Sequence, residues 1–484
     1  MSEHAVVIAG GGPTGLMLAG ELALAGIDVV IAERRNSQVV SGSRAGGLLS
    51  RTIEVLDQRG IADRFLSEGQ VHPFQLFAMV TLNISDFPSR HNYILALWQS
   101  QFEPILADWV EELGVPILRS REVVGFTQDD QGVEVELCDD TLLRAQYLIG
   151  CDGGRSLIRT LAGIDFCGLE PTTSWIVAEV EMDEEPEAGM RYDNIGAHGL
   201  NRMGENGPIR LVLTEQNLRR HDNPSIDELR EALEVVYGTD FGLRSAHWIS
   251  RFTDMTRQAE VYRCDRVLLA GDAAHIHPPH GGQGLNTGIQ DAVNLGWKLA
   301  QVVKKVSPDS LLNSYGAERY PVAARVLQNT MVQVLLNRGG ERHQALRETM
   351  TELLCMEEPR KRIAGMLSGL DIHYDFGEGH PLLGRRMPDI EMQTSEGAMR
   401  VYSLLHSAQP LLLNFGEPDR LNIPDDQVRI VSAIYDGLWE LPVLGEVTPP
   451  KAVLIRPDGY VAWVGDHVDS ALSQACEKWF GIIL

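Results

Sequence analysis

The chain has no pair of cysteines spaced for redox or metal chemistry. Its six cysteines are scattered and none belongs to a C-x-x-C pair, so the sequence indicates neither a disulfide framework nor a zinc site. It also lacks any run of about eighteen apolar residues, which argues against a transmembrane helix. The first apolar strand begins almost at residue 1, so we expect no signal peptide and a cytoplasmic protein.

Positive charge is scarce as well. Lysine and arginine number 42 against 67 acidic residues, the net charge is -25, and no basic run is present. Such a surface repels nucleic acid and anionic lipid, so we expect no nucleic-acid partner and no membrane partner. No repeat or low-complexity segment is visible, and 484 residues exceed what one core usually serves, so two or three domains are expected.

Glycine, by contrast, is concentrated at a functional spacing near the N-terminus. An apolar strand over 6–9 leads into Gly10, Gly12 and Gly15, which have the spacing G-x-G-x-x-G, and a second apolar strand ends at Glu33. In such a unit the glycines let the backbone approach a pyrophosphate at the positive end of a helix, and the acid accepts hydrogen bonds from a ribose. The stretch therefore predicts a dinucleotide site.

Two later strands end in small residues and an acid. The stretch 147–156 contains Asp152, and the stretch 266–275 contains Gly271-Asp272. A loop with Pro278 and Pro279 follows, then four small or polar residues and a helix from about 287 to 303. Backbone amides at this helix start would point toward an electron-rich ring or a developing anion, the alternative being a glycine-rich loop that only begins a helix. The three loop histidines lack a metal-binding spacing such as H-E-x-x-H, and we predict no metal.

The middle and the end of the chain have a different character. From about 175 to 264, strand-like stretches with alternating polarity surround one helix over 226–237, which predicts an inserted sheet with one face over a cavity and the other toward water. A linker near 380–388 leads to a C-terminal domain with strands at 410–415, 429–433 and 452–456 and a closing helix over 470–479.

Three motifs in one order carry a resemblance to a known family. They are G-G-G-P-T-G with Glu33, C-D-G-G-R-S at 151–156, and G-D-A-A-H followed by P-P-H-G-G-Q-G-L-N within 271–286. The chain resembles the group A flavoprotein aromatic hydroxylases, single-component FAD monooxygenases that use NAD(P)H. Its C-terminal L-I-R-P-D-G-Y-V-A-W resembles the branch of aromatic polyketide hydroxylases and rifampicin monooxygenases, which ends in a thioredoxin-like domain without the redox C-x-x-C.

The resemblance implies an α/β architecture in four segments. A Rossmann-like FAD-binding domain is expected in two parts, 1–174 and 265–378, the second with connecting helices. An inserted β-sheet substrate domain is expected over 175–264, and a thioredoxin-like α/β domain over 379–484. Without its own redox motif the last domain is expected to serve packing or dimerisation, in a monomer or a homodimer.

At the adenosine end of FAD, the resemblance assigns residues from three places. Glu33 and Arg34 would meet the adenosine, and the backbone of Val123 would lie near the adenine. Asp152 belongs to a motif that the family uses for FAD and NAD(P)H together. The residues assigned to the pyrophosphate are Gly10, Gly12, Pro13, Thr14 and Gly15.

At the flavin end, Arg44 matches an arginine near the ring, and Gln99 matches a glutamine beside the ribityl chain. Trp98 stands where relatives commonly have proline, and Gln101 offers a rival amide. Asp272 would bind the ribityl or phosphate region. The residues expected at the pyrimidine edge are Gly282, Gly284, Leu285 and Asn286. The residues expected to act in catalysis are Arg44, Pro278 and Pro279, the prolines by excluding water.

The activity that the resemblance implies is hydroxylation of a small aromatic molecule, a polyketide, quinone or phenol, with FAD as cofactor and NADPH or NADH and O2 as co-substrates. Oxygen would pass from a C4a-hydroperoxide of the flavin. The same chemistry also serves Baeyer–Villiger insertion, epoxidation or inactivation of an antibiotic, and a non-catalytic flavin-binding protein is a further alternative. A flavin-dependent halogenase is disfavoured because no W-x-W-x-I-P stretch is present. Candidate pocket residues are Arg191, Tyr192, His198 and Asn201.

Overall fold

The computed structural model describes most of the chain. The described residues are 2–40, 42, 45–78, 80–204, 207–220, 223–416, 427–467 and 469–483. Arg44, which the sequence predicts near the flavin, lies outside them, so its assignment stays a prediction. Among the helices of the described residues, none is long and apolar enough to cross a bilayer.

A mostly parallel sheet forms the centre of the molecule, with the strand order β19-β20-β11-β1-β2-β8. β1 (Ser2–Ala9) lies between two parallel partners, β2 (Val29–Glu33) and β11 (Leu142–Gly150). β8 (Ile117–Arg119) and β20 (Val267–Leu269) extend the parallel pairing on either side. The antiparallel strands of this sheet are β9 (Val123–Asp129), β10 (Gly132–Leu137) and β19 (Arg263–Cys264). Because parallel strands end at one edge, the loops after β1, β2, β11 and β20 lie together there.

Helices with small residues pack closely beside this sheet. α1 (Pro13–Leu24) lies against α4 (Gln99–Glu112) and α7 (Gln283–Val303). A Cβ at Gly20 would lie 2.2 Å from the Trp109 ring, so α1 and α4 approach as closely as only glycine permits. α7 begins four residues earlier than the sequence predicts.

Further elements complete this part of the chain. They are β3 (Gly47–Leu48), α2 (Ser50–Asp57), α3 (Ala62–Leu66), β4 (Gln70–His72), β5 (Phe74–Phe77), β6 (Val80–Asn83), β7 (Ile94–Ala96), α5 (Leu157–Leu161), α8 (Asn313–Leu336), α9 (Glu341–Leu354) and α10 (Glu357–Ser368). Ala78, with φ of 45°, lies in the turn of a hairpin between β5 and β6.

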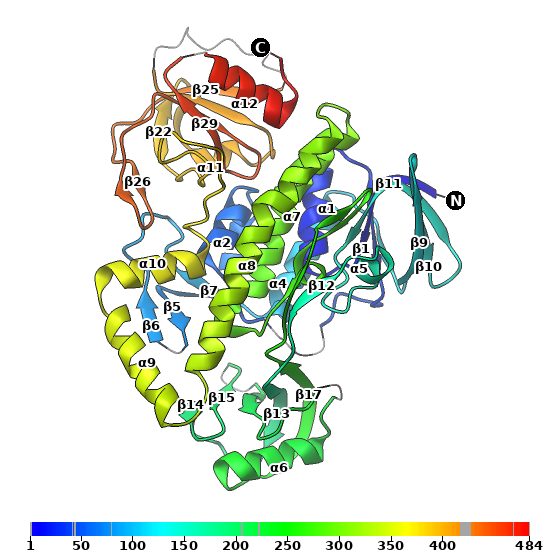
Figure 1. Ribbon diagram of the computed structural model, residues 1–484, viewed down its shortest axis with the longest axis vertical. Helices are drawn as coiled ribbons and strands as arrows, with labels where there is room; N and C mark the ends of the chain where they lie inside the picture. Colours follow the sequence, from blue (N-terminus) through cyan, green and yellow to red (C-terminus); the bar gives the residue numbers. More distant parts are fainter. Residues whose placement is uncertain are drawn as a thin grey trace.

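The inserted region is a five-stranded antiparallel sheet at one end of the molecule (Figure 1). Its order is β14 (Gly189–Tyr192), β15 (Ala197–Arg202), β16 (Ile209–Thr214), β13 (Ser174–Met182) and β17 (Leu243–Thr253). α6 (Ile226–Tyr237) covers one face through Leu229 and Leu233, which pack on Ile176 and Leu211. The expectation that this face meets water is therefore wrong, because the amphipathic helix supplies it with an apolar core. A small sheet of β12 (Phe166–Leu169), β18 (Thr256–Ala259) and β21 (His275–Ile276) connects the insertion to the rest.

The C-terminal region lies at the opposite end (Figure 1) and has its own core. Its strand order is β23 (Gly397–Arg400), β22 (Glu391–Thr394), β25 (Arg429–Ile434), β24 (Leu411–Asn414), β28 (Ala452–Ile455) and β29 (Val461–Gly465). β24 pairs in parallel with β25 and antiparallel with β28. With α11 (Val401–Leu404) and the closing α12 (Ser470–Phe480), this is the mixed α/β arrangement that the sequence predicts.

Candidate active site

The N-terminal glycine turn joins β1 to α1. A Cβ at Gly10 would lie 2.4 Å from the carbonyl oxygen of Cys151, and one at Gly15 would lie 2.0 Å from that of Gly10, so both positions need glycine for packing. Gly12 is different, because its Cβ would meet nothing within 4 Å. It is the N-cap of α1 without a side-chain cap, and Pro13 occupies the first turn. Uncapped amides beside open space fit a pyrophosphate.

The acid at the end of β2 closes this turn. The Glu33 carboxylate accepts hydrogen bonds from the Gly11 amide at 2.5 Å and from the Arg35 amide and Nε at 2.8 and 3.0 Å. Burial opposes ionisation, but the Arg35 and Gly11 hydrogen bonds outweigh it and lower the pKa of Glu33. Arg34 is exposed, whereas Arg35 also pairs with the buried Glu103 at 2.6 Å. Arg35 is thus a site residue that the sequence reasoning missed.

The two rival amides at the start of α4 have different surroundings. The Gln101 Oε1 accepts a hydrogen bond from the Trp98 amide at 3.3 Å, within the helix cap. The Gln99 Nε2 instead donates to the Glu103 Oε2 at 2.9 Å, in the polar cluster around Glu33. Trp98 lies 4.8 Å below the guanidinium of Arg210 from the inserted sheet. Its departure from the family pattern therefore coincides with a contact to the insertion.

Two further predicted residues lie near this edge. Val123 is buried at the start of β9, and the neighbouring Arg121 amide donates to the Glu33 carbonyl at 3.0 Å, so the segment runs beside the end of β2. The Asp152 Oδ2 accepts from the Ile158 amide at 3.1 Å, while its Oδ1 is buried with no hydrogen-bond partner among the described residues. Both cofactor assignments stay predictions.

Thr14 brings the first and third motifs together. A Cβ at Gly271 would lie 2.6 Å from the Thr14 Oγ1, and a Cβ at Gly288 would lie 2.4 Å from it. The starts of α1 and α7 therefore lie side by side, with Thr14 between two glycines. Asp272 follows β20 and has an exposed side chain at this edge.

The start of α7 is a second uncapped helix end. Gly282, with φ of 63°, is its N-cap without a side-chain cap, and a Cβ there would meet nothing within 4 Å. The Asn286 Nδ2 donates to the carbonyls of Gly282 at 2.7 Å and Gly47 at 3.2 Å, and its Oδ1 accepts from the Leu49 amide at 2.8 Å. Its side chain therefore fixes the loop, and a contact with the flavin would have to use backbone. Gly284 and the half-buried Leu285 lie in the first turn.

A buried carboxylate inside α7 holds the strand end from below. Asp291 accepts from the His275 Nε2 at 2.7 Å, the Arg319 Nε at 2.7 Å and the Gly271 amide at 3.2 Å. Burial raises the pKa of Asp291, but Arg319 and His275 outweigh it and lower the pKa overall. The sequence reasoning missed this residue, although Asp291, Asn294 and Lys298 share one face of an otherwise apolar helix. His275 is thereby a partner of Asp291.

The proline loop lies between α7 and the inserted sheet. Pro278 is buried and Pro279 is exposed. Burial lowers the pKa of His277 and of His280 to about 4 each, so both imidazoles are neutral at pH 7. The His280 ring stands edge-on to Trp175 of β13, with centroids 5.5 Å apart. The loop and the inserted sheet therefore meet through an aromatic contact.

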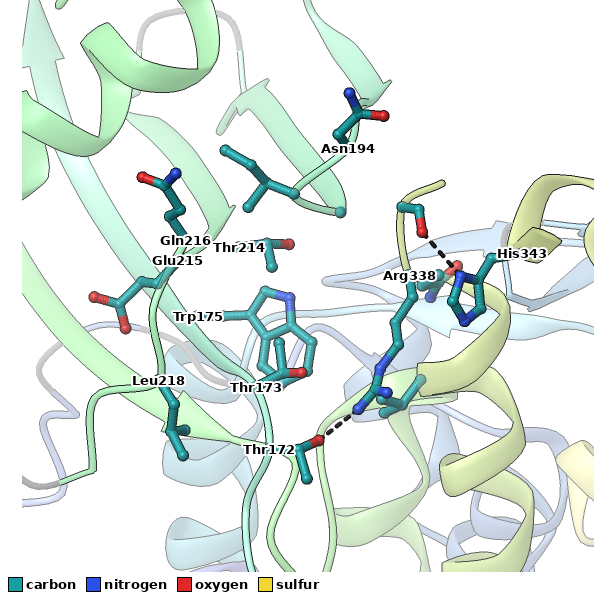
Figure 2. Close-up of a pocket in the computed structure, with 15 residues that line it drawn as sticks. Thr172, Thr173, Trp175, Asn194, Thr214, Glu215, Gln216, Leu218, Arg338 and His343 are labelled. Atoms are coloured by element: carbon teal, nitrogen blue, oxygen red, sulfur yellow. Dashed lines mark hydrogen bonds between the residues drawn. The ribbon is translucent and has the colours of Figure 1, made fainter. Parts of the chain in front are cut away.

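A cavity of about 230 Å³ opens beside that contact, between the inserted sheet and the junction of α8 and α9 (Figure 2). The four pocket candidates from the sequence do not line it. His198 is fully buried, with its Nε2 3.1 Å from Asp193 and its Nδ1 accepting from the Thr214 amide at 3.2 Å. The sheet contributes other residues instead, which are Thr172, Thr173, Trp175, Asn194, Ile195, Gly196, Thr214, Glu215, Gln216 and Leu218.

Comparison with known proteins agrees with this geometry. The FAD binding domain family matches residues 3–330, and the C-terminal domain of aromatic-ring hydroxylases matches residues 380–482. A rifampicin monooxygenase of Streptomyces venezuelae is 42% identical, with 98% of each chain covered. A solved anhydrotetracycline hydroxylase of Streptomyces rimosus is 39% identical, with a TM-score of 0.91 and all of both chains covered. A dialkyldecalin synthase of Streptomyces rugosporus is 37% identical, with 98% of each chain covered. The chain belongs to the FAD-dependent aromatic-ring hydroxylases, a family of flavoprotein monooxygenases.

Proposed function

We propose that this protein hydroxylates a polycyclic aromatic substrate of the polyketide, quinone or phenol class, using FAD, O2 and NADPH or NADH. The observation that carries the proposal is the placement of Thr14 between Gly271 and Gly288, which puts two uncapped helix starts at one sheet edge. When bound, FAD would supply the redox chemistry by which electrons from NAD(P)H and one oxygen atom of O2 reach the reaction, the second oxygen atom leaving as water.

The residues of the site divide the work of holding such a cofactor. The amides at the start of α1 would bind the pyrophosphate beside Gly12, where a side chain is absent. Glu33, organised by Arg35, would accept hydrogen bonds from the adenosine ribose. The exposed carboxylate of Asp272 would accept them from ribityl hydroxyls, and the start of α7 would stabilise negative charge on the flavin ring.

The contact between the proline loop and the inserted sheet would help to keep water out of the site. Pro278 is buried, and the His280 ring packs edge-on against Trp175, so the proline loop and the inserted sheet are in direct contact. Exclusion of water favours oxygen transfer over unproductive oxidation of the reduced cofactor. A neutral His280 would neither repel a substrate cation nor hold a phenolate by charge.

The test is turnover by the FAD-loaded protein with NADPH and two polycyclic probes, anhydrotetracycline and rifampicin. We expect faster NADPH consumption with at least one probe, and a product that carries one atom from isotopically labelled O2. The position of that atom separates ring hydroxylation from Baeyer–Villiger insertion and epoxidation. The absence of both stimulated NADPH consumption and labelled product would refute the proposal.

The relative named as a dialkyldecalin synthase favours a second candidate, a ring-forming reaction in which FAD is structural. That reaction would convert substrate without O2 and without NADPH. Anaerobic incubation with the same probes distinguishes the two. All six cysteines are free, which supports a cytoplasmic location, and we infer a monomer or homodimer.

A further inference from the structure

The cavity beside Trp175 has two walls (Figure 2). The sheet wall offers one aromatic ring among polar side chains: Trp175, which stacks on Phe252 outside the cavity with centroids 5.2 Å apart and planes 12° from parallel. The opposite wall comes from the junction of α8 and α9 and is polar, with Asn337, Arg338 and His343. A planar molecule can lie against the first wall while its edge groups meet the second.

Two acceptors on the polar wall remain open. The Asn337 Oδ1 is buried and has no hydrogen-bond partner among the described residues. The His343 Nδ1 donates to the Gly339 carbonyl at 2.9 Å, so its Nε2 carries the lone pair and is an acceptor. A buried acceptor without a partner is unfavourable, because it has lost its hydrogen bonds to water. An occupant that donates hydrogen bonds, such as a hydroxylated ring, would satisfy both atoms.

Charge in the cavity is already balanced. Arg338 donates to the Thr172 Oγ1 at 2.5 Å and lies 3.7 Å from the Asp254 carboxylate. Glu215 forms a paired contact with Arg251 at 2.8 and 2.9 Å. The occupant is therefore uncharged. The remaining N–H groups of the Arg338 guanidinium can donate hydrogen bonds to a carbonyl oxygen at the edge of the occupant.

The size of the cavity limits what it holds. At about 230 Å³ it is smaller than the roughly 300–1,000 Å³ of sites that enclose a whole drug-sized ligand, so it takes one or two rings. The His280–Trp175 contact places it next to the proline loop. We propose that this cavity is a specificity subsite, which selects substrates by a hydroxyl- and carbonyl-bearing ring at the end that is not oxidised. The inference rests on the proposed function for its substrate class.

The test is equilibrium binding to the FAD-loaded protein without NADPH, so that it does not depend on turnover. Anhydrotetracycline is the large probe, with hydroxyl and carbonyl groups along its edge, and naphthalene, which has no hydrogen-bonding group, is the small probe. The double variant Asn337→Ala/His343→Phe removes both open acceptors. We expect its Kd for anhydrotetracycline to rise about tenfold or more, because two hydrogen bonds are lost, and its Kd for naphthalene to change less than about twofold.

Two further variants sharpen the result. Gln344→Ala alters an exposed residue of the same helix outside the cavity and should bind both probes as the wild type does. Asn337→Ala/His343→Gln returns an acceptor and should recover part of the lost affinity. Flavin content and far-UV circular dichroism report whether each variant is folded.

Each remaining outcome decides the inference. Equal weakening of both probes, or no weakening of anhydrotetracycline, overturns it, as does a wild type that binds neither anhydrotetracycline nor rifampicin. Selective weakening without any labelled product in the turnover test keeps the subsite and removes the proposed function. Labelled product together with equal weakening of both probes keeps the proposed function and overturns the subsite.

Discussion

The two ends of the molecule meet the central part in opposite ways (Figure 1). At the C-terminal end, Arg456 is fully buried, and both of its terminal nitrogens bind Glu318, at 2.8 and 2.7 Å. Its Nε donates to Asp458 at 3.0 Å. At the other end, the inserted sheet faces α8 and α9 across a cavity in which the Asn337 oxygen has no partner among the described residues. Every nitrogen of the Arg456 guanidinium is paired within the protein, whereas the Asn337 oxygen is an acceptor that a ligand could use.

Two further buried arginines contribute to the first interface. The turn 456–459 receives the Arg51 guanidinium at the carbonyl of Asp458, 2.8 Å away, and that of Arg59 at the carbonyl of Pro457, also 2.8 Å away. Arg59 in turn pairs with Glu21 of α1 at 2.6 Å. Buried charges that are paired within the protein hold one geometry, whereas a buried acceptor without a partner can accept a hydrogen bond from a ligand. The difference suggests that the C-terminal domain fixes the scaffold while the insertion adapts to substrate.

The largest effect should come from breaking the ion pairs of Arg456. Arg456→Met removes the guanidinium that pairs with both Glu318 and Asp458 and leaves Lys298 as the cation beside Glu318, and we expect the free energy of unfolding to fall by about 3–5 kcal/mol in urea denaturation. Burial opposes ionisation of Glu318, but Arg456 and Lys298 outweigh it and lower its pKa to about 2, so the loss of Arg456 removes the main interaction that offsets the burial of this carboxylate. The matched control Lys451→Met breaks an exposed pair with Asp466 and should change stability by less than about 1 kcal/mol.

A loss below about 1 kcal/mol for Arg456→Met would mean that solvent enters the interface and replaces the missing cation. The comparison would then fail, because the C-terminal contact would be as adaptable as the cavity.

An intermediate effect should appear at the open sheet edge, and only when ligand is present. Gly12→Ala adds a Cβ that meets nothing within 4 Å, at a negative φ of -79°, so the stability of the FAD-free protein should be unchanged. The same Cβ would occupy the space that a pyrophosphate needs, and we expect the Kd for FAD to rise about tenfold or more. Flavin fluorescence titration measures this.

Gly316→Ala is the control for that substitution, because its Cβ has only Tyr262, at 4.0 Å, within reach and lies inside α8. It should leave FAD affinity as it is and slightly raise stability, by about 0.5–1 kcal/mol. Unchanged FAD affinity in Gly12→Ala would place the pyrophosphate elsewhere.

Elements with strong local signals could be predicted from the sequence. The predicted helix over 226–237 agrees with α6, whose start has a capping box between Ser225 and Glu228 and whose end has Gly238 at φ of 76°. α7 begins earlier than predicted, since Gly282 takes a left-handed conformation that periodicity does not reveal. α9 was not identified as a separate helix, because Leu354 is its only buried residue and the apolar stripe is faint.

The site divides in the same way. Gly10, Gly12 and Asp272 could be singled out from the sequence because each belongs to a short motif whose residues are neighbours in the chain. The cavity does not, because it forms between Trp175 and Asn337, which are far apart in sequence. Nor does spacing separate Arg34 from Arg35 at a strand end, where the partner Glu103 comes from another helix.

The smallest effect concerns the charge of Lys298, which is buried beside Glu318 in the same interface. Its Nζ lies 3.1 Å from Glu318, yet burial lowers its pKa to about 8, with Glu318 opposing and Arg456 adding to the shift. Between about pH 8 and the unfolded value near 10.4, the unfolded chain holds a proton that the folded chain has lost, so this residue makes stability rise with pH. The difference in unfolding free energy between wild type and Lys298→Met should therefore increase by about 1 kcal/mol from pH 8 to pH 9. Tyrosine ionisation cancels in that difference because both proteins share it. A flat difference would show that the folded protein keeps Lys298 charged, and that the network of Glu318, Arg456 and Asp458 balances its charge fully.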